Sequence, residues 1–126
     1  MKEYPRKLRI NTQLQAELAT LIRDELSDPR VAGVTVTGVD ISPDLRNARV
    51  TISSLGSDAE LQEALRGLKH AAGKLRHGLG ERLSLRVVPQ LHFAVDVAMR
   101  EGDRISAMIR DAVEQDRQHE SSRSKP

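Results

Sequence analysis

Six basic side chains between residues 66 and 86 are the groups in this sequence best suited to binding another molecule by charge. They share that segment with one acid, Glu81, so it carries a net charge of +5 in a chain whose total is +2. The six cations are Arg66, Lys69, Lys74, Arg76, Arg82 and Arg86. Residues 10–65 carry −5, and residues 87–126 carry −1. Charge segregated in this way focuses a positive potential on part of the surface and predicts a polyanion as the partner.

A glycine stands inside this basic segment, where apolar spacing otherwise predicts a helix. Leu61, Leu65 and Leu68 recur at helical spacing, and the stripe resumes at Leu75. A glycine within a helix costs about 1 kcal/mol relative to alanine, so Gly73 predicts a kink, a break or a close backbone approach. A second helix over about residues 74–82 would offer free amides and a positive dipole end to a phosphate oxygen. The alternative is a solvated basic face on a helix that covers a sheet.

A second group of cations lies at the start of the chain. Residues 1–9 carry a net charge of +3, and Arg6, Lys7 and Arg9 stand where an amphipathic pattern begins. Cations at the amino end of a helix oppose its dipole, which a nearby anion would relieve. We predict these three residues as a second contact with the polyanion, with a solvated amino-terminal arm as the alternative.

Residues suited to catalysis or metal binding are present, but not at the spacing that such chemistry needs. There is no cysteine, and the four histidines lack the spacing of metal ligands. The glycines at positions 73 and 78 are spaced as in a nucleotide-binding loop, but Leu79 and Gly80 replace its Lys and its Ser or Thr. The sequence therefore predicts no metal, no cofactor, no small-molecule substrate and no enzyme. An enzyme stays open as an alternative, with Asp40, Asp44 and His92 as its candidate groups.

Composition also bears on location and on the mode of nucleic-acid recognition. No apolar run approaches the length of a signal peptide or a membrane span, and a chain without cysteine suits a reducing compartment. We therefore predict a cytoplasmic protein with no membrane partner. The aromatic residues are Tyr4 and Phe93, and Phe93 alternates with residues that a core would bury. Base stacking is thus disfavoured, and contacts with the nucleic-acid backbone are predicted.

Periodic patterns around the cations predict the elements that position them. Apolar residues at steps of three and four predict a helix over about residues 8–26, which Asp28-Pro29 follows as a turn. Two β-branched segments, over residues 34–41 and 48–55, predict a hairpin with a bulge at Gly38. Ser57 and Glu60 form a capping box that starts the next helix.

The second half of the chain supplies one more strand and one more helix. A strand is predicted over residues 85–97, and Pro89 places its start at a sheet edge or a bulge. Asp103 is predicted to cap a final helix whose apolar stripe includes Ile105 and Ile109. From residue 115 onward the chain is polar and predicts a flexible tail. Helices on one face of a small sheet make a two-layer α+β domain.

Three stretches of the chain carry a distinctive combination of motifs. The first runs from Asp28-Pro29-Arg30 through Val34-Thr35-Val36-Thr37-Gly38-Val39 to Ser42-Pro43-Asp44-Leu45-Arg46-Asn47-Ala48-Arg49-Val50. The second is Leu68-Lys69-His70-Ala71-Ala72-Gly73-Lys74-Leu75-Arg76, and the third is Leu85-Arg86-Val87-Val88-Pro89-Gln90-Leu91-His92-Phe93 with Asp96. In this combination, from about Arg6 to Ile109, the chain closely resembles the bacterial ribosome-binding factor A family.

The resemblance implies a type II KH-like fold. In that fold a kinked Ala-x-Gly, here Ala71-Ala72-Gly73, replaces the usual Gly-x-x-Gly loop. It also implies a non-enzymatic assembly factor that binds the 30S subunit during late 16S rRNA maturation, leaves before translation and matters in cold adaptation. The final helix and the tail belong to a region that varies in this family, so the resemblance assigns them no role.

These observations together predict one KH-like RNA-binding domain over residues 1–114 and a flexible polar tail over residues 115–126. The element order is α-β-β-α-kink-α-β, with an additional C-terminal helix. The predicted function is that of a monomer that contacts the 16S rRNA backbone in the free 30S subunit. The alternative is a protein-interaction module whose basic face docks an acidic protein. The predicted RNA-binding residues are Arg6, Lys7, Arg9, Lys69, Ala71, Gly73, Lys74, Arg76, Arg82 and Arg86.

Overall fold

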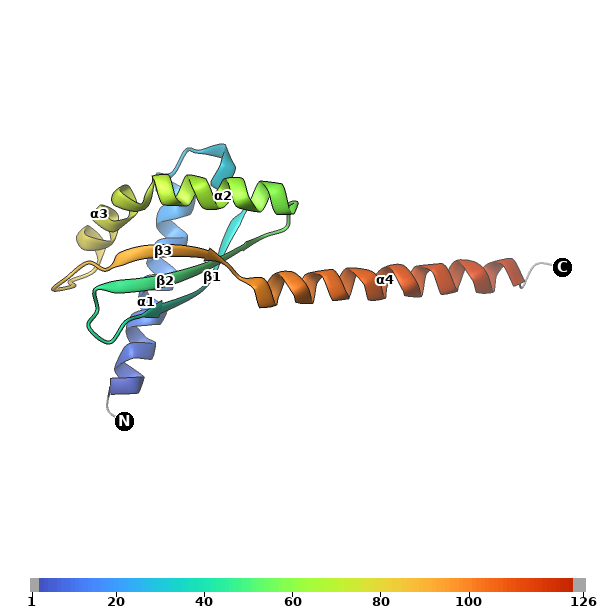
Figure 1. The fold of residues 1–126 in the computed structure, drawn as a ribbon, viewed down its shortest axis with the longest axis horizontal. Coiled ribbons are helices and arrows are strands. Elements are labelled where there is room, and N and C mark those ends of the chain that lie inside the picture. Colours follow the sequence, from blue (N-terminus) through green and yellow to red (C-terminus); the bar gives the residue numbers. More distant parts are fainter. Residues whose placement is uncertain (1–2, 124–126) are drawn as a thin grey trace. The chain divides into compact units, whose positions relative to one another are not determined.

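The computed structural model describes the backbone of residues 3–123 and the side chains of residues 6–118. The chain divides into one compact unit that ends at Asp96 and a second that begins at Val97. The elements of the first unit are α1 (Glu3–Glu25), the single 3-10 turn η1 (Pro29–Val31), β1 (Val34–Ile41), β2 (Asn47–Ser54), α2 (Asp58–His70), α3 (Ala72–Arg82) and β3 (Gln90–Val95) (Figure 1). The second unit is the helix α4 (Val97–Arg123). The predicted order of helices and strands is confirmed.

The three strands form one mixed sheet in the order β1-β2-β3. β1 and β2 pair antiparallel as a hairpin, and β3 lies parallel to β2 on its other side. The register of the hairpin shifts between Val36 and Gly38, so Thr37 is the extra residue of a β-bulge at the predicted place. A side chain at position 38 would crowd this site, because its Cβ would lie 3.0 Å from Thr51 Oγ1.

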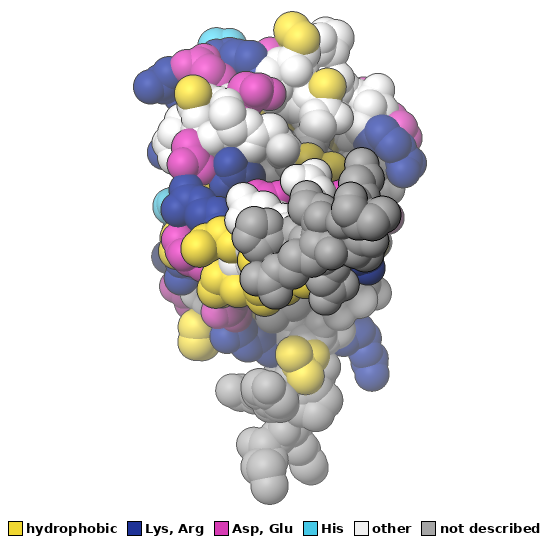
Figure 2. All heavy atoms as spheres, turned by 90° about the vertical axis from the view of Figure 1, so that its right-hand side faces the viewer, with side chains coloured by type: hydrophobic (Ala, Val, Ile, Leu, Met, Phe, Trp, Pro, Cys, Tyr) yellow, Lys and Arg dark blue, Asp and Glu magenta, His cyan; other side chains and the backbone are white. Residues whose placement is uncertain are grey.

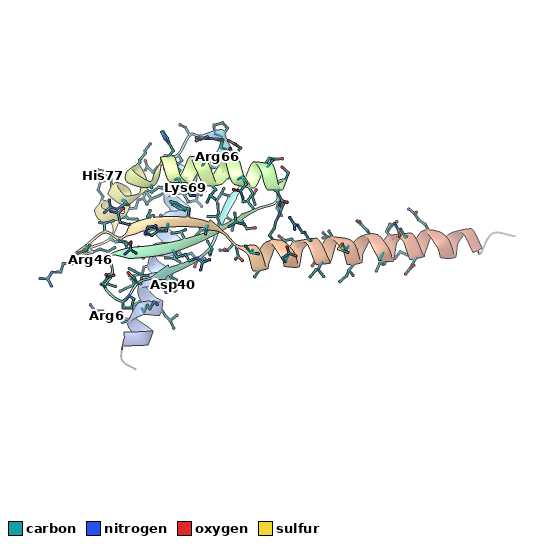
Figure 3. The ribbon with its side chains drawn as sticks, viewed as in Figure 1. Arg6, Asp40, Arg46, Arg66, Lys69 and His77 are labelled. Atoms are coloured by element: carbon teal, nitrogen blue, oxygen red, sulfur yellow. The ribbon has the colours of Figure 1, made fainter. Side chains whose placement is uncertain are left out.

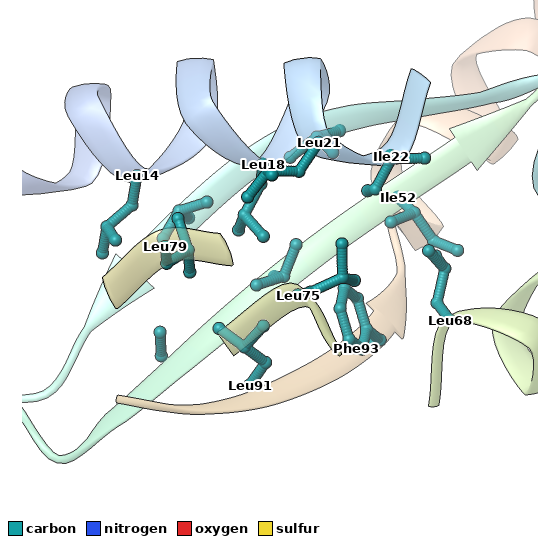
Figure 4. Close-up of a cluster of buried hydrophobic side chains, with 14 of the residues drawn as sticks. Leu14, Leu18, Leu21, Ile22, Ile52, Leu68, Leu75, Leu79, Leu91 and Phe93 are labelled. Carbon is teal, nitrogen blue, oxygen red and sulfur yellow. The ribbon is translucent and has the colours of Figure 1, made fainter. Parts of the chain in front are cut away.

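One face of the sheet is buried under α1, α2 and α3. Alternate strand residues point to this face, since successive side chains of a strand point to opposite sides. The sheet contributes Val36, Val39, Ile41, Ala48, Val50, Ile52, Leu91 and Phe93 to the core. The helices contribute Leu14, Leu18, Leu21, Ile22, Leu61, Leu68, Leu75 and Leu79 (Figure 4). Phe93 is buried as predicted, so its ring is not available to stack on a base.

Side chains of α1 also satisfy the backbone of the edge strand β1. Asn11 Oδ1 accepts a hydrogen bond of 2.9 Å from the Ile41 amide, and Gln15 Nε2 donates one of 3.2 Å to the Val36 carbonyl. These bonds occupy groups that would otherwise be open to pairing with another chain. They also fix the position of α1 along the sheet edge.

Two boundaries in the second half differ from the sequence prediction. β3 begins at Gln90, and residues 83–89 form a loop, because Pro89 has no amide to donate to a ladder. α4 begins at Val97, six residues before the predicted cap Asp103, and passes through Gly102. It continues through residues 115–123, which were predicted to belong to a flexible tail. The predicted tail residues 124–126 lie outside the described residues, and the domain limit at residue 114 stays a prediction.

Candidate nucleic-acid interface

The predicted interface centres on the junction between α2 and α3. Ser57 caps α2, since its Oγ accepts a hydrogen bond of 3.1 Å from the Glu60 amide, as the capping box predicted. The bend follows at Ala71, whose φ of −88° and ψ of 2° depart from helical values. The Ala71 amide still bonds to the Gly67 carbonyl, and its carbonyl accepts from the Leu75 amide, both at 3.0 Å. The two helices are thus joined without an intervening loop.

Gly73 does not make this bend. It lies one residue inside α3 and is exposed, and a Cβ there would meet no described atom within 4 Å apart from the neighbouring backbone of its own helix. The kink therefore occurs within the predicted Ala71–Gly73 stretch, but at Ala71. The prediction that Gly73 makes the kink is wrong. Close approach instead occurs at Gly78, where a Cβ would lie 2.7 Å from Leu21 Cδ2. Gly78 lets α3 pack against α1, and Gly73 leaves the start of α3 uncovered.

Four of the predicted RNA-binding residues surround this bend, and we call them the junction patch. They are Lys69, Ala71, Gly73 and Lys74. Lys69 is exposed and makes no ion pair or hydrogen bond with the described side chains. Lys74 Nζ donates a hydrogen bond of 2.9 Å to the Glu25 carbonyl at the C-terminal end of α1. Its ammonium keeps two further donors, so Lys74 can bond the carbonyl at the end of α1 and still contact a phosphate.

Arg76 and Arg82 have internal partners that the sequence did not show. Arg76 is half-buried, and its guanidinium donates hydrogen bonds of 3.1 Å to the carbonyls of both Val88 and Pro89. Arg82 lies 3.5 Å from a carboxylate oxygen of Glu17 and 3.7 Å from one of Glu25. Arg76 therefore supports the loop over residues 83–89, and Arg82 contributes little free charge. RNA contact by either residue stays a prediction.

The amino-terminal cations lie far from the junction patch along α1. Lys7 Nζ forms an ion pair of 2.9 Å with Asp40 of β1, whereas Arg6 and Arg9 are exposed. Eighteen residues of α1 separate Lys7 from Glu25, a distance of about 27 Å at 1.5 Å per residue. Figure 3 shows Arg6 near the start of α1, with Lys69 and His77 on the helical layer formed by α2 and α3. The predicted residues therefore form two separate groups.

Arg86 and the remaining surface charges complete the description of the predicted site. Arg86 is exposed in the loop over residues 83–89. The two hydrogen bonds from Arg76 fix the end of this loop that precedes β3. Arg66 pairs with Glu63, and His77 lies 3.1 Å from Glu81. On the face drawn in Figure 2, basic and acidic side chains lie beside one another. Net positive charge is therefore local to particular groups of residues.

The fold brings together only part of the candidate catalytic set Asp40, Asp44 and His92. Asp40 and His92 flank Arg49 across the sheet, and Asp40 is paired with Lys7. Asp44 belongs to the turn, where the hydroxyl of Ser42 and the amide of Arg46 bond its carboxylate and hold its pKa below the usual range. Among the residues that the structure describes, no group of three His, Asp or Glu residues could hold a metal ion. Within the same part of the chain, no helix is long and apolar enough to cross a membrane.

Arg49 and His92 are exposed neighbours in the sheet, and the sequence did not bring them together. The register pairs Arg49 with His92 on β3 and with Asp40 on β1. Alternation within each strand showed which face these residues occupy. The parallel pairing of β2 with β3, which makes them neighbours, has no signal in the local sequence.

Comparison with known proteins identifies the family. The family model for ribosome-binding factor A matches residues 6–109. Ribosome-binding factor A of Alkalilimnicola ehrlichii is 50% identical over 118 residues, which cover 93% of this chain and 91% of the relative. That of Stutzerimonas stutzeri is 46% identical over 126 residues, with 97% of each chain covered.

Solved structures agree with the fold and with this assignment. The crystal structure of ribosome-binding factor A from Thermus thermophilus has a TM-score of 0.65 and 31% identity, covering 71% of this chain and 93% of that one. A homology model of the Thermus thermophilus factor, fitted into a cryo-EM map of a 30S–RbfA complex, has a TM-score of 0.57 and 32% identity over 67% of this chain and 88% of that one. The predicted KH-like α+β fold is thus confirmed. The matching model, the identities and the shared fold show that this chain belongs to the ribosome-binding factor A family.

Proposed function

We propose that this protein is a non-enzymatic ribosome assembly factor that binds the free 30S subunit through the 16S rRNA backbone and assists late 16S rRNA maturation. The observation that carries this proposal is the likeness over nearly the whole chain to ribosome-binding factor A, together with the 30S complex of the Thermus thermophilus member. The family is described as a binding factor, in agreement with the expected non-enzymatic role. The protein acts as a monomer in this proposal.

The junction patch supports contact with RNA backbone. Among the described residues, Lys69 is exposed without a partner, Lys74 keeps donors in excess of its single bond, and no side chain covers Gly73. Ammonium groups beside an uncovered stretch of backbone suit phosphate oxygens, which supply most of the affinity in sequence-independent recognition of nucleic acids. The buried ring of Phe93 is consistent with backbone contact at this patch.

Charge reversal at Lys69 tests the proposal with little disturbance of the fold, because its exposed side chain makes no ion pair or hydrogen bond with the described side chains. Lys69→Glu should weaken binding to purified 30S subunits and reduce the log–log salt slope by about one or more. Arg110→Glu makes the same change of charge on α4 and is the matched control. Binding is measured by sedimentation with 30S subunits over a range of salt concentrations. Equal affinities of Lys69→Glu, Arg110→Glu and the unchanged protein would refute contact by the junction patch.

Nuclease treatment separates RNA from an acidic protein partner, because salt weakens the contacts of a basic face with either one. Contacts with rRNA phosphates release counterions, so affinity should fall linearly with salt on a log–log plot. Nuclease treatment of the complex should release the protein if RNA holds it. A protein that stays bound to a ribosomal protein after complete digestion of the RNA would favour the alternative of a protein-interaction module.

A further inference from the structure

A shallow pocket lies beside the amino-terminal end of α1, where strand residues that face away from the core meet Lys7, and away from the junction patch. Its volume is about 440 Å³, within the usual range for small-ligand sites. Polar side chains from four elements or turns supply its lining, and those that carry the argument are Lys7, Asp40, Asn47, Arg49 and His92. None of them except Lys7 was among the predicted RNA-binding residues.

Cross-strand pairing fixes the centre of this pocket. Arg49 lies on the middle strand, with Asp40 as its partner on β1 and His92 as its partner on β3. His92 Nε2 and Asn47 Oδ1 are 2.8 Å apart. Because an amide oxygen only accepts, Nε2 carries the hydrogen, and the bond orients the imidazole ring over the strand. The pocket thus presents one planar aromatic ring held beside one guanidinium.

Charge within the pocket is divided unequally. Lys7 and Asp40 form an ion pair of 2.9 Å and largely neutralise one another. Arg49 is exposed and makes no ion pair or hydrogen bond with the side chains that the structure describes. Arg46, labelled in Figure 3, precedes the lining residue Asn47 in the sequence but does not itself line the pocket. The uncompensated charge is therefore positive and centred on Arg49.

We propose that this pocket binds one unpaired nucleotide of RNA. The imidazole of His92 stacks on the base, the guanidinium of Arg49 holds a phosphate, and the carboxylate of Asp40 accepts a hydrogen bond from a ribose hydroxyl or a base amine. Aromatic rings and guanidinium planes are the groups that receive bases splayed out of single-stranded RNA. A base within a duplex keeps its faces stacked and cannot enter. That the nucleotide belongs to rRNA rests on the proposed function.

This assignment explains the chemistry of the pocket better than a simple anion site does. A bare phosphate would meet the carboxylate of Asp40 and would make no use of the oriented ring of His92. A nucleotide uses all three groups, because it combines an aromatic face, hydrogen-bond donors and a negative charge. The pocket also lies at the end of α1 that carries Arg6 and Arg9, whose charges can hold the adjoining backbone.

Histidine ring resonances in NMR spectra test the proposal on the full chain. His92 reports on the pocket, and His70, next to Lys69, reports on the junction patch. Short oligoadenylate and oligouridylate, which are single-stranded, should shift the His92 resonance saturably. The same shift should be absent with an RNA duplex or with inorganic phosphate. Arg49→Ala should weaken the His92 response about fivefold or more, as expected for loss of a nucleotide contact, and Arg110→Ala should not.

The outcomes separate this inference from the proposed function. A His92 resonance that does not respond to single-stranded RNA, or that responds equally to inorganic phosphate, overturns the nucleotide pocket. The proposed function stands in that case if Lys69→Glu still weakens 30S binding. A saturable His92 response that Arg49→Ala reduces supports the pocket, even if Lys69→Glu leaves 30S binding unchanged and the junction patch is refuted.

Discussion

Substitution of Gly73 by alanine tests the geometry of the helix junction directly. A Cβ at this position meets no heavy atom within 4 Å, and no described glycine has a positive φ, so alanine fits without strain. Alanine also restricts the unfolded chain and favours the helix. We expect Gly73→Ala to raise the free energy of unfolding by about 0.5–1 kcal/mol. For a domain of this size, the melting temperature should rise by about 2–8 °C.

The same substitution at Gly78 is the matched control, because both glycines lie in α3. A Cβ at position 78 would lie 2.7 Å from Leu21 Cδ2 and 3.2 Å from Leu21 Cδ1. Leu21 is only 2% exposed, so the surrounding core resists its movement. We expect Gly78→Ala to lower the free energy of unfolding by about 1–3 kcal/mol, as overpacked cores do. Opposite signs at the two positions would show that environment, and not helix propensity, decides the effect.

Urea unfolding followed by circular dichroism measures both effects, and 30S binding is measured on the same variants. A loss of about 1 kcal/mol or more in Gly73→Ala would refute the assignment of the bend to Ala71, because Gly73 would then have a conformational role. If RNA backbone lies against Gly73, the added methyl should weaken 30S binding although stability rises. Unchanged affinity would remove Gly73 from the predicted RNA contacts.

Two further predictions concern groups with internal partners. Arg76→Lys keeps the charge but cannot span both the Val88 and Pro89 carbonyls. The free energy of unfolding should therefore fall by about 1 kcal/mol, while the salt slope of 30S binding stays unchanged. Unchanged stability with an altered salt slope would instead make Arg76 an RNA contact. The side chain and amide of Arg30 bond the Asp28 carboxylate and hold its pKa below the ordinary 3.8, so the ionised form stabilises the fold at neutral pH and that stabilisation is lost as pH falls below about 4. Acid titrations of stability should therefore be less steep for Asp28→Asn than for the unchanged protein, and parallel curves would contradict this.

Much of the fold could be predicted from the sequence because burial follows side-chain period. Leucines at steps of three and four marked the face of α1 that packs on the sheet, and alternation marked the buried side of each strand. Gly38 marked the bulge, because a side chain there would meet Thr51 on the paired strand. Ser57 and Glu60 marked the start of α2 through bonds between residues three apart. Each of these signals is local, so the printed sequence contains it.

The errors occurred where a residue had two possible uses. Gly102 and Asp103 resemble a stop and a cap, but α4 passes through both, since an exposed helix tolerates a glycine at a cost of about 1 kcal/mol. Leu85, Val87 and Val88 resemble part of a strand, but they belong to a loop that Arg76 supports from another element. Gly73 looks like the bend, whereas Ala71 makes it. Local sequence does not decide among these uses, because distant contacts do.

The predicted site changed most, because a sequence records charges and not their partners. The net charge of +5 over residues 66–86 does not act as one surface: Arg82 faces two carboxylates, Arg76 faces two carbonyls, and Lys69 has no partner among the residues that the structure describes. Lys7 of the second predicted group lies beside the pocket at Arg49, about 27 Å along α1 from Glu25, whose carbonyl accepts from Lys74. If both groups bind RNA, two separated contacts on one compact unit would hold a large RNA by avidity, because engagement of one raises the effective concentration at the other. Loss of either group should therefore weaken binding to the 30S subunit without abolishing it. Loss of both groups should lower the affinity for the 30S subunit far more than loss of one contact lowers the affinity for a short oligonucleotide.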